Sequence, residues 1–146
     1  MLSRKKKVLF VCVHNSARSV IAEKMLNQLC GDVYEAQSAG IEPGKLNPIV
    51  AQAMAEIGVD VSSHQPRSVA DVIQSGEQFA TVITVCDETS AERCPIFLGQ
   101  VERLHWGFPD PSRLNGTPDE KLEATREIRD HIKAHIEDEF CATRCA

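Results

Sequence analysis

Two continuous apolar runs constrain the fold of this chain more than any other feature. Residues 7–12 read KVLFVC and residues 79–85 read FATVITV, with almost no polar interruption. Strands of this composition are usually buried on both faces, which is typical of parallel sheets covered by helices. We therefore expect both runs to be buried strands of such a sheet.

The segments around these runs alternate between helical and extended patterns. Apolar residues at helical spacing, with Gly or Asn-Pro at the segment ends, predict helices at residues 16–30, 48–57, 67–76 and 118–138. Two further strands are expected at residues 33–38 and 101–105. Strands that alternate with helices predict a parallel sheet covered on both faces. We expect one domain over residues 1–146, with a frayed tail at 140–146.

Composition excludes several classes of partner. The 146 residues carry a net charge of −5, which argues against binding nucleic acid or an anionic membrane. No apolar run reaches the length of a membrane span, and the N-terminal segment lacks a signal-peptide cleavage site, so we expect a cytoplasmic protein. Six cysteines in that compartment should rest as thiols. They are candidates for catalysis, redox chemistry or metal binding rather than a disulfide framework.

Cys12 ends the first apolar run and is followed by a polar turn and a helix. The carboxyl edge of an open α/β sheet is where ligands bind, and backbone N–H groups at a helix N-terminus attract anions. The guanidinium of Arg18 suits a tetrahedral oxyanion, and the same field favours a thiolate. Ser16 or Ser19 could hydrogen-bond the sulfur. The alternative is a structural cysteine beside a surface arginine. We predict an oxyanion loop formed by Val13, His14, Asn15, Ser16, Ala17, Arg18 and Ser19, with Cys12 as nucleophile.

Cys86 directly follows the second apolar run, so it should share the sheet edge of Cys12 if the two strands are neighbours. Cys94 lies eight residues further on, across a polar segment. A segment of that length could let Cys86 pair first with Cys12 and then with Cys94, which would be a thiol relay. The alternative is two incidental thiols. The spacing of these two cysteines is not a common zinc pattern, and no metal site is expected.

Asp110 stands between two prolines in the segment PDP, which stiffens the backbone around its carboxylate. A general acid needs such fixed placement, although an isolated PDP is more often a simple turn. Cys30 at a helix end is most simply a packing residue, and Cys141 and Cys145 are expected to be exposed thiols in the tail.

These residues together resemble the low-molecular-weight tyrosine phosphatase superfamily, and more closely the thioredoxin-coupled arsenate reductases built on that fold. The similarity runs from Val8 to about Glu139. Its landmarks are VCVHNSARS at 11–19, SAG at 38–40, Asn47-Pro48, Cys86, Cys94-Pro95 and HWGFPDP at 105–111. The resemblance implies a three-layer α/β/α fold with a four-stranded parallel sheet.

The resemblance also implies a mechanism. Cys12 would attack arsenate held by Arg18, and Asp110 would protonate the leaving oxygen. Cys86 would then attack the sulfur of Cys12, and arsenite would leave. Cys94 would next attack Cys86 and form a second disulfide with it. Thioredoxin would reduce that disulfide as an external reductant, with no bound cofactor. Phosphate and sulfate would compete with arsenate, and a monomer is expected.

Two points qualify the resemblance. Some members of the superfamily bind potassium near the loop, and Asn15, Glu23 and Ser38 match that site, but Arg67 stands where an acidic residue is usual. We therefore expect no tight potassium site. A phosphatase acting on phosphotyrosine or another phosphomonoester would need Cys12, Arg18 and Asp110 but neither Cys86 nor Cys94. The two extra cysteines favour the reductase, with weak phosphatase activity beside it.

Overall fold

A parallel sheet forms the centre of the molecule. The structure, a computed structural model, describes residues 6–12, 18–40, 44–45, 47–61, 64–65, 67–85, 102–106 and 115–141. Its four strands are β1 (Lys6–Cys12), β2 (Tyr34–Gly40), β3 (Thr81–Thr84) and β4 (Glu102–His105). They pair in the order β2-β1-β3-β4, and every pair is parallel. The first apolar run is therefore an inner strand, which explains why all of its residues from Val8 to Cys12 are buried.

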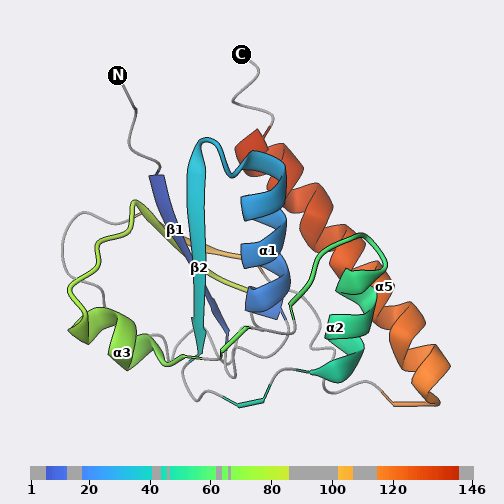
Figure 1. Cartoon of the computed structure of the whole chain (residues 1–146). Coiled ribbons are helices and arrows are strands. Elements are labelled where there is room, and N and C mark those ends of the chain that lie inside the picture. Colours follow the sequence, from blue (N-terminus) through green and yellow to red (C-terminus); the bar gives the residue numbers. More distant parts are fainter. Residues whose placement is uncertain are drawn as a thin grey trace.

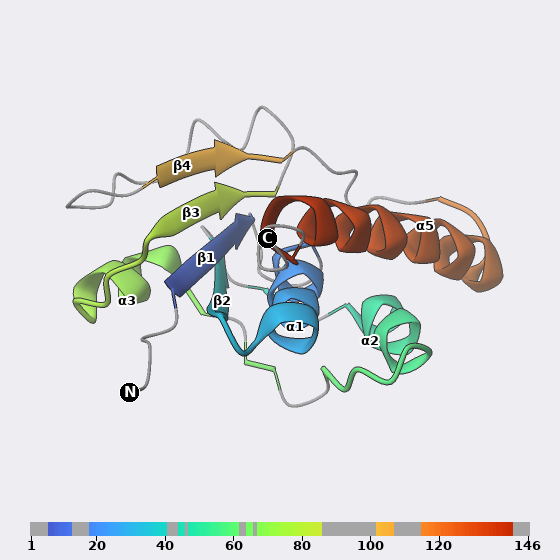
Figure 2. The same cartoon turned by 90° about the horizontal axis from the view of Figure 1, so that it is seen from above.

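In the described part of the chain, helices lie on both faces of this sheet. On one face lie α1 (Arg18–Cys30) and α5 (Pro118–Ile136), with α2 (Pro48–Ala55) packed against α5. On the other face lies the short α3 (Val69–Gln74), so the molecule has three layers (Figures 1 and 2). Alternate residues of β1 serve the two cores: Phe10 belongs to the larger one, whereas Leu9 and Val11 belong to the smaller one. The predicted α/β class is confirmed.

The helix ends follow the chemistry predicted from sequence. Asn47 caps α2 by accepting a hydrogen bond from the Ile49 amide at 2.9 Å. Helix α1 ends at Cys30, and a Cβ on the next residue, Gly31, would lie 2.1 Å from the Asn27 carbonyl oxygen. Only glycine therefore fits at position 31. None of the helices described by the structure is both long and apolar enough to cross a membrane.

The expectation of a frayed tail from residue 140 is wrong for its first residues. The helical segment η2 (Glu137–Cys141) continues directly from α5. The ring of Phe140 is buried, with its centroid 5.0 Å from that of Tyr34 and 5.9 Å from that of Trp106. The burial of this large aromatic side chain helps to keep this end of the chain folded. Residues 142–146 lie outside the described residues.

The expectation that all cysteines rest as thiols is wrong for Cys30. Cys30 is fully buried, with 0% of its surface exposed, and it is disulfide-bonded. The side chain of its partner is not among those that the structure describes. Cys30 is thus more than a packing residue, and this disulfide was not predicted from the sequence.

Candidate oxyanion site at the carboxyl edge of the sheet

Cys12 is the last residue of β1 and sits at the carboxyl edge of the sheet, paired in register with Gly40 of β2. Its side chain is 2% exposed and is not part of a disulfide. The sulfur lies 2.8 Å from the hydroxyl oxygen of Ser19, in a buried hydrogen bond. Either group can be the donor of this bond, which holds the sulfur beside the first turn of α1. Of the two serines considered from sequence, Ser19 therefore makes the contact, whereas Ser16 lies outside the described residues.

Arg18 begins helix α1, directly beyond the loop that follows Cys12. It is only 4% exposed, an unusual degree of burial for a guanidinium. The first turn of α1 contains no acidic residue that would neutralise the positive end of the helix dipole. A buried arginine at the start of a helix whose next residue, Ser19, contacts the Cys12 sulfur is an arrangement suited to an anion that a nucleophile attacks. The intervening loop residues, Val13, His14, Asn15, Ser16 and Ala17, lie outside the described residues.

Two backbone hydrogen bonds place the residues that precede the other predicted site residues at the same edge of the sheet. The amide of Val85, the residue before Cys86, donates to the carbonyl of Val11, the residue before Cys12, at 2.9 Å. One strand further along, the amide of Trp106 donates to the carbonyl of Thr84 at 2.7 Å. Cys86, Cys94 and Asp110 themselves lie outside the described residues, so their predicted roles stay predictions.

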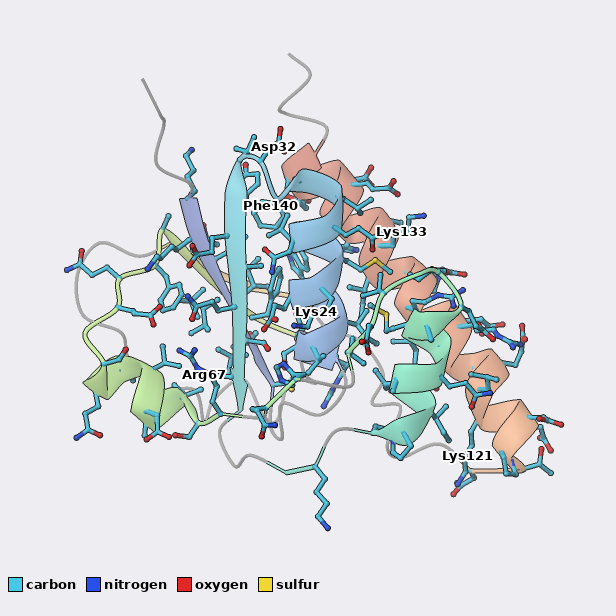
Figure 3. All side chains as sticks on the ribbon, in the orientation of Figure 1. Lys24, Asp32, Arg67, Lys121, Lys133 and Phe140 are labelled. Atoms are coloured by element: carbon cyan, nitrogen blue, oxygen red, sulfur yellow. The ribbon has the colours of Figure 1, made fainter. Side chains whose placement is uncertain are left out.

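Glu23, in the second turn of α1, is one of the residues matched to a potassium site. The hydroxyl of Ser38 donates to its carboxylate at 2.5 Å, and the ammonium of Lys24 lies 2.9 Å from it. Arg67 pairs with Glu77 at 3.8 Å, and its backbone carbonyl accepts from Gly40 at 2.8 Å. Figure 3 shows Lys24 on α1 and Arg67 beside the lower half of β2. Within the described ranges, no three potential metal-ligating side chains are grouped.

His64 is a neighbour of this carboxylate that sequence reasoning missed. Burial is the main cause of a lowered pKa for His64. The negative charge of Glu23 opposes that shift, whereas the positive charges of Lys24 and Arg67 add to it. No pattern in the sequence points to His64, because it lies in an irregular segment between α2 and α3 and meets α1 only in the folded chain.

Comparison with known proteins agrees with this geometry. The model of the low molecular weight phosphotyrosine protein phosphatase family matches residues 7–142. The chain belongs to this family, and the class of fold predicted from the sequence is confirmed.

Within the family, the chain is similar to arsenate reductases. It is 37% identical to a protein of Bacillus subtilis named arsenate reductase, over 94% of this chain and 96% of that one. The solved structure of an arsenate reductase in its oxidised state has a TM-score of 0.74 at 27% identity, and the match covers 91% of this chain and 95% of that one. A thioredoxin-dependent arsenate reductase of Corynebacterium glutamicum matches with a TM-score of 0.64 at 28% identity, over 94% of this chain and 64% of that one. The resemblance inferred from the sequence is confirmed.

Proposed function

We propose that this protein is an arsenate reductase that uses Cys12 as its nucleophile. The observation that carries the proposal is the Cys12 sulfur, hydrogen-bonded at 2.8 Å to Ser19 in the first turn of the helix that begins with the buried Arg18. It joins the similarity to proteins named arsenate reductase along almost the whole chain. A thiol in an anion site can attack arsenic, which sulfur binds readily, as well as phosphorus.

The first step is the capture of arsenate. The guanidinium of Arg18, the start of α1 and the loop of residues 13–17 hold its oxygens, and the thiolate of Cys12 forms a bond to arsenic. Asp110 donates the proton with which one oxygen leaves as water. Phosphate and sulfate have the same tetrahedral shape and compete for the site.

The second step transfers the electrons. The thiolate of Cys86 attacks the Cys12 sulfur, an S–S bond forms and the S–As bond breaks with its electron pair left on arsenic. Arsenic passes from the +5 to the +3 state, and two thiols become the Cys12–Cys86 disulfide. The hydrogen bond from Val85 to Val11 supports this pairing, because it joins the residues that directly precede the two cysteines.

The third step regenerates Cys12. The thiolate of Cys94 attacks Cys86, Cys12 leaves as a thiolate, and a Cys86–Cys94 disulfide forms. A thioredoxin then reduces that disulfide with its own dithiol, so no bound cofactor is required. The solved structure of a thioredoxin-dependent relative supports the choice of reductant. We further propose a single domain over residues 1–146 that acts as a cytoplasmic monomer, with no nucleic acid partner.

A phosphatase is the second candidate, favoured by the family to which the chain belongs. Arsenate-dependent oxidation of NADPH, coupled through thioredoxin and thioredoxin reductase, is measured beside hydrolysis of an aryl phosphate. Cys12→Ser should abolish both activities. Cys86→Ser should abolish reduction and keep hydrolysis.

Two further variants sharpen this test. Cys94→Ser should release one arsenite per enzyme and then stop, because Cys12 stays locked to Cys86. Cys145→Ala, outside the relay, is the matched cysteine control and should keep both rates within about twofold. Full reduction by Cys86→Ser would contradict the relay, and activity in Cys12→Ser would contradict the site.

A further inference from the structure

The disulfide of Cys30 lies at the end of α1 opposite to the proposed active site. Cys12 is not disulfide-bonded. The partner of Cys30 is therefore one of the four remaining cysteines, which are Cys86, Cys94, Cys141 and Cys145.

Position along the sheet argues against Cys86. The carbonyl of Cys30 accepts from the amide of Val33 at 3.0 Å, and the carbonyl of Val33 accepts from Lys6, the first residue of β1, also at 3.0 Å. Cys30 is thus at the amino edge of the sheet. Cys86 follows Val85, which is bonded to Val11 at the carboxyl edge. The seven residues of β1 separate these edges by about 20 Å, whereas a disulfide requires Cα atoms within about 7 Å.

The C-terminal segment, in contrast, packs against the helix that ends at Cys30. Segment η2 ends at Cys141 and packs against α1. The ring of Phe140 contacts that of Tyr34, which follows Cys30 by four residues. Both Figure 1 and Figure 2 place the C-terminal end of the α5 ribbon beside the end of α1, and Figure 3 shows Phe140 at that end together with Asp32. We propose that Cys30 and Cys141 form a disulfide that fastens the C-terminal segment to α1.

This disulfide is a second redox couple, separate from the relay of Cys12, Cys86 and Cys94. A dithiol reductant would open it through a mixed disulfide, giving the thiols of Cys30 and Cys141 and an oxidised dithiol; a small-molecule disulfide would reverse the exchange. Because Cys30 is fully buried, its sulfur is shielded from attack while η2 is in place. The bond should therefore open slowly while η2 is in place.

The consequence of the bond is the placement of Phe140. That ring lies 6.5 Å from Phe10, two residues before Cys12, and 5.9 Å from Trp106, four residues before Asp110. A cross-link between residues 30 and 141 also restricts the unfolded chain over most of its length, which stabilises the folded state. The disulfide therefore keeps the Phe140 ring in contact with Phe10 and Trp106 without taking part in the reaction.

Disulfide mapping tests the pairing directly. The Cys86→Ser protein, which cannot form either relay disulfide, is purified without reductant, its thiols are blocked by alkylation, and its peptides are analysed by mass spectrometry. We expect a linked peptide pair containing Cys30 and Cys141. Any other partner for Cys30, Cys145 included, or an alkylated Cys30, overturns the proposal.

Two matched variants test the effect. Without reductant, the melting temperature of Cys141→Ala should be about 10 °C below that of the unchanged chain. Cys145→Ala should have the melting temperature of the unchanged chain. After complete reduction the difference between Cys141→Ala and the unchanged chain should vanish. Equal melting temperatures without reductant would overturn the proposal. Arsenate turnover in excess thioredoxin should stay within about twofold in both variants. If the proposed disulfide of Cys30 and Cys141 is wrong, the proposed relay is therefore not affected.

Discussion

Helix α1 has a cysteine near each end, and the two cysteines differ in their state. Near its start, Cys12 lies outside any disulfide, and its sulfur is 2.8 Å from the hydroxyl oxygen of Ser19 in the first turn. At its end, where the helix dipole is negative, Cys30 is disulfide-bonded. Both cysteines are buried and belong to the larger apolar core, so burial alone does not decide what a cysteine does.

The difference is in what each sulfur is available to do. Cys12 lies outside any disulfide and near the end of α1 where an anion is favoured, so its sulfur is available as the nucleophile of the proposed reaction. Cys30 is disulfide-bonded at the opposite end, so its sulfur serves as a structural cross-link. The same helix therefore has an available sulfur near its anion-binding start and a cross-linked one at its end.

Replacing Arg18 should have the largest effect, and only at the active end. Arg18→Lys keeps one positive charge but loses the planar pair of donors that fits two oxygens of a tetrahedral anion. We expect kcat/KM for arsenate reduction to fall about 100-fold or more. Arg126→Lys is the control, because Arg126 pairs with Glu56 in a partly exposed ion pair between α5 and the end of α2 and should keep kcat/KM within about twofold. A small loss in Arg18→Lys would remove the distinction between the two ends.

Removing Phe140 should have the next largest effect, and only at the structural end. Phe140→Ala deletes a buried ring that contacts Tyr34, Phe10 and Trp106, which should cost about 3 kcal/mol of the free energy of unfolding. The measurement is denaturant unfolding, together with the rate at which a dithiol reduces the disulfide of Cys30. That rate should rise in Phe140→Ala.

Phe79→Ala is the matched control for this experiment. Phe79 is equally well buried but belongs to the smaller core on the other face of the sheet. It should destabilise the protein by a similar amount without selectively exposing the disulfide of Cys30. If both variants speed reduction equally after correction for stability, Phe140 has no special link with that end of α1.

The fold was largely predictable because it rests on local patterns. The uninterrupted run at residues 7–12 predicts an inner strand, and β1 is one. Asn47 before Pro48 predicts the start of α2, and Gly31 predicts the end of α1. Such signals depend on residues that are neighbours in the chain, so no tertiary information is needed to interpret them.

The candidate site was predictable only where chemistry and local position coincide. Cys12 ends β1 and Arg18 begins α1, so the positions of both residues follow from signals that are neighbours in the chain, whereas their roles stay predictions. The disulfide of Cys30 and the burial of Phe140 depend on how α5 and η2 return to α1, which no short pattern records. His64 was missed for the same reason, since it meets Glu23 only through the tertiary fold.

Removing the Ser19 hydroxyl should have a moderate effect at the active end. Ser19→Ala deletes the hydroxyl oxygen that lies 2.8 Å from the Cys12 sulfur. We expect alkylation of Cys12 by iodoacetamide at pH 7 to slow about tenfold, the loss of one hydrogen bond to a charged group. Ser75→Ala, which loses a bond to the Val72 carbonyl on the far side of the sheet, is the control and should leave that rate unchanged. An unchanged rate in Ser19→Ala would mean that the hydroxyl does not support the thiolate.

Replacing His64 should have the smallest effect. His64 is a neighbour of Glu23, which lies in the half of α1 nearer to Cys12. Because burial lowers the pKa of His64 in the folded state below its ordinary value of 6.5, the unfolded state takes up the proton first as the pH falls. Stability is therefore lost as the pH decreases through 6.5, and it is fully present above that value. Lys24 and Arg67 strengthen this dependence and Glu23 weakens it.

His64→Gln removes the titrating group and should flatten the decrease in unfolding free energy between pH 7.5 and 5.5. The measurement is urea unfolding at several pH values across that range. His131→Gln, at an exposed position on α5, should keep the slope of the unchanged chain. If the unfolding free energy of His64→Gln changes with pH as steeply as that of the unchanged chain, protonation of His64 does not cause this pH dependence. His64 would then contribute nothing to the difference between the two ends of α1.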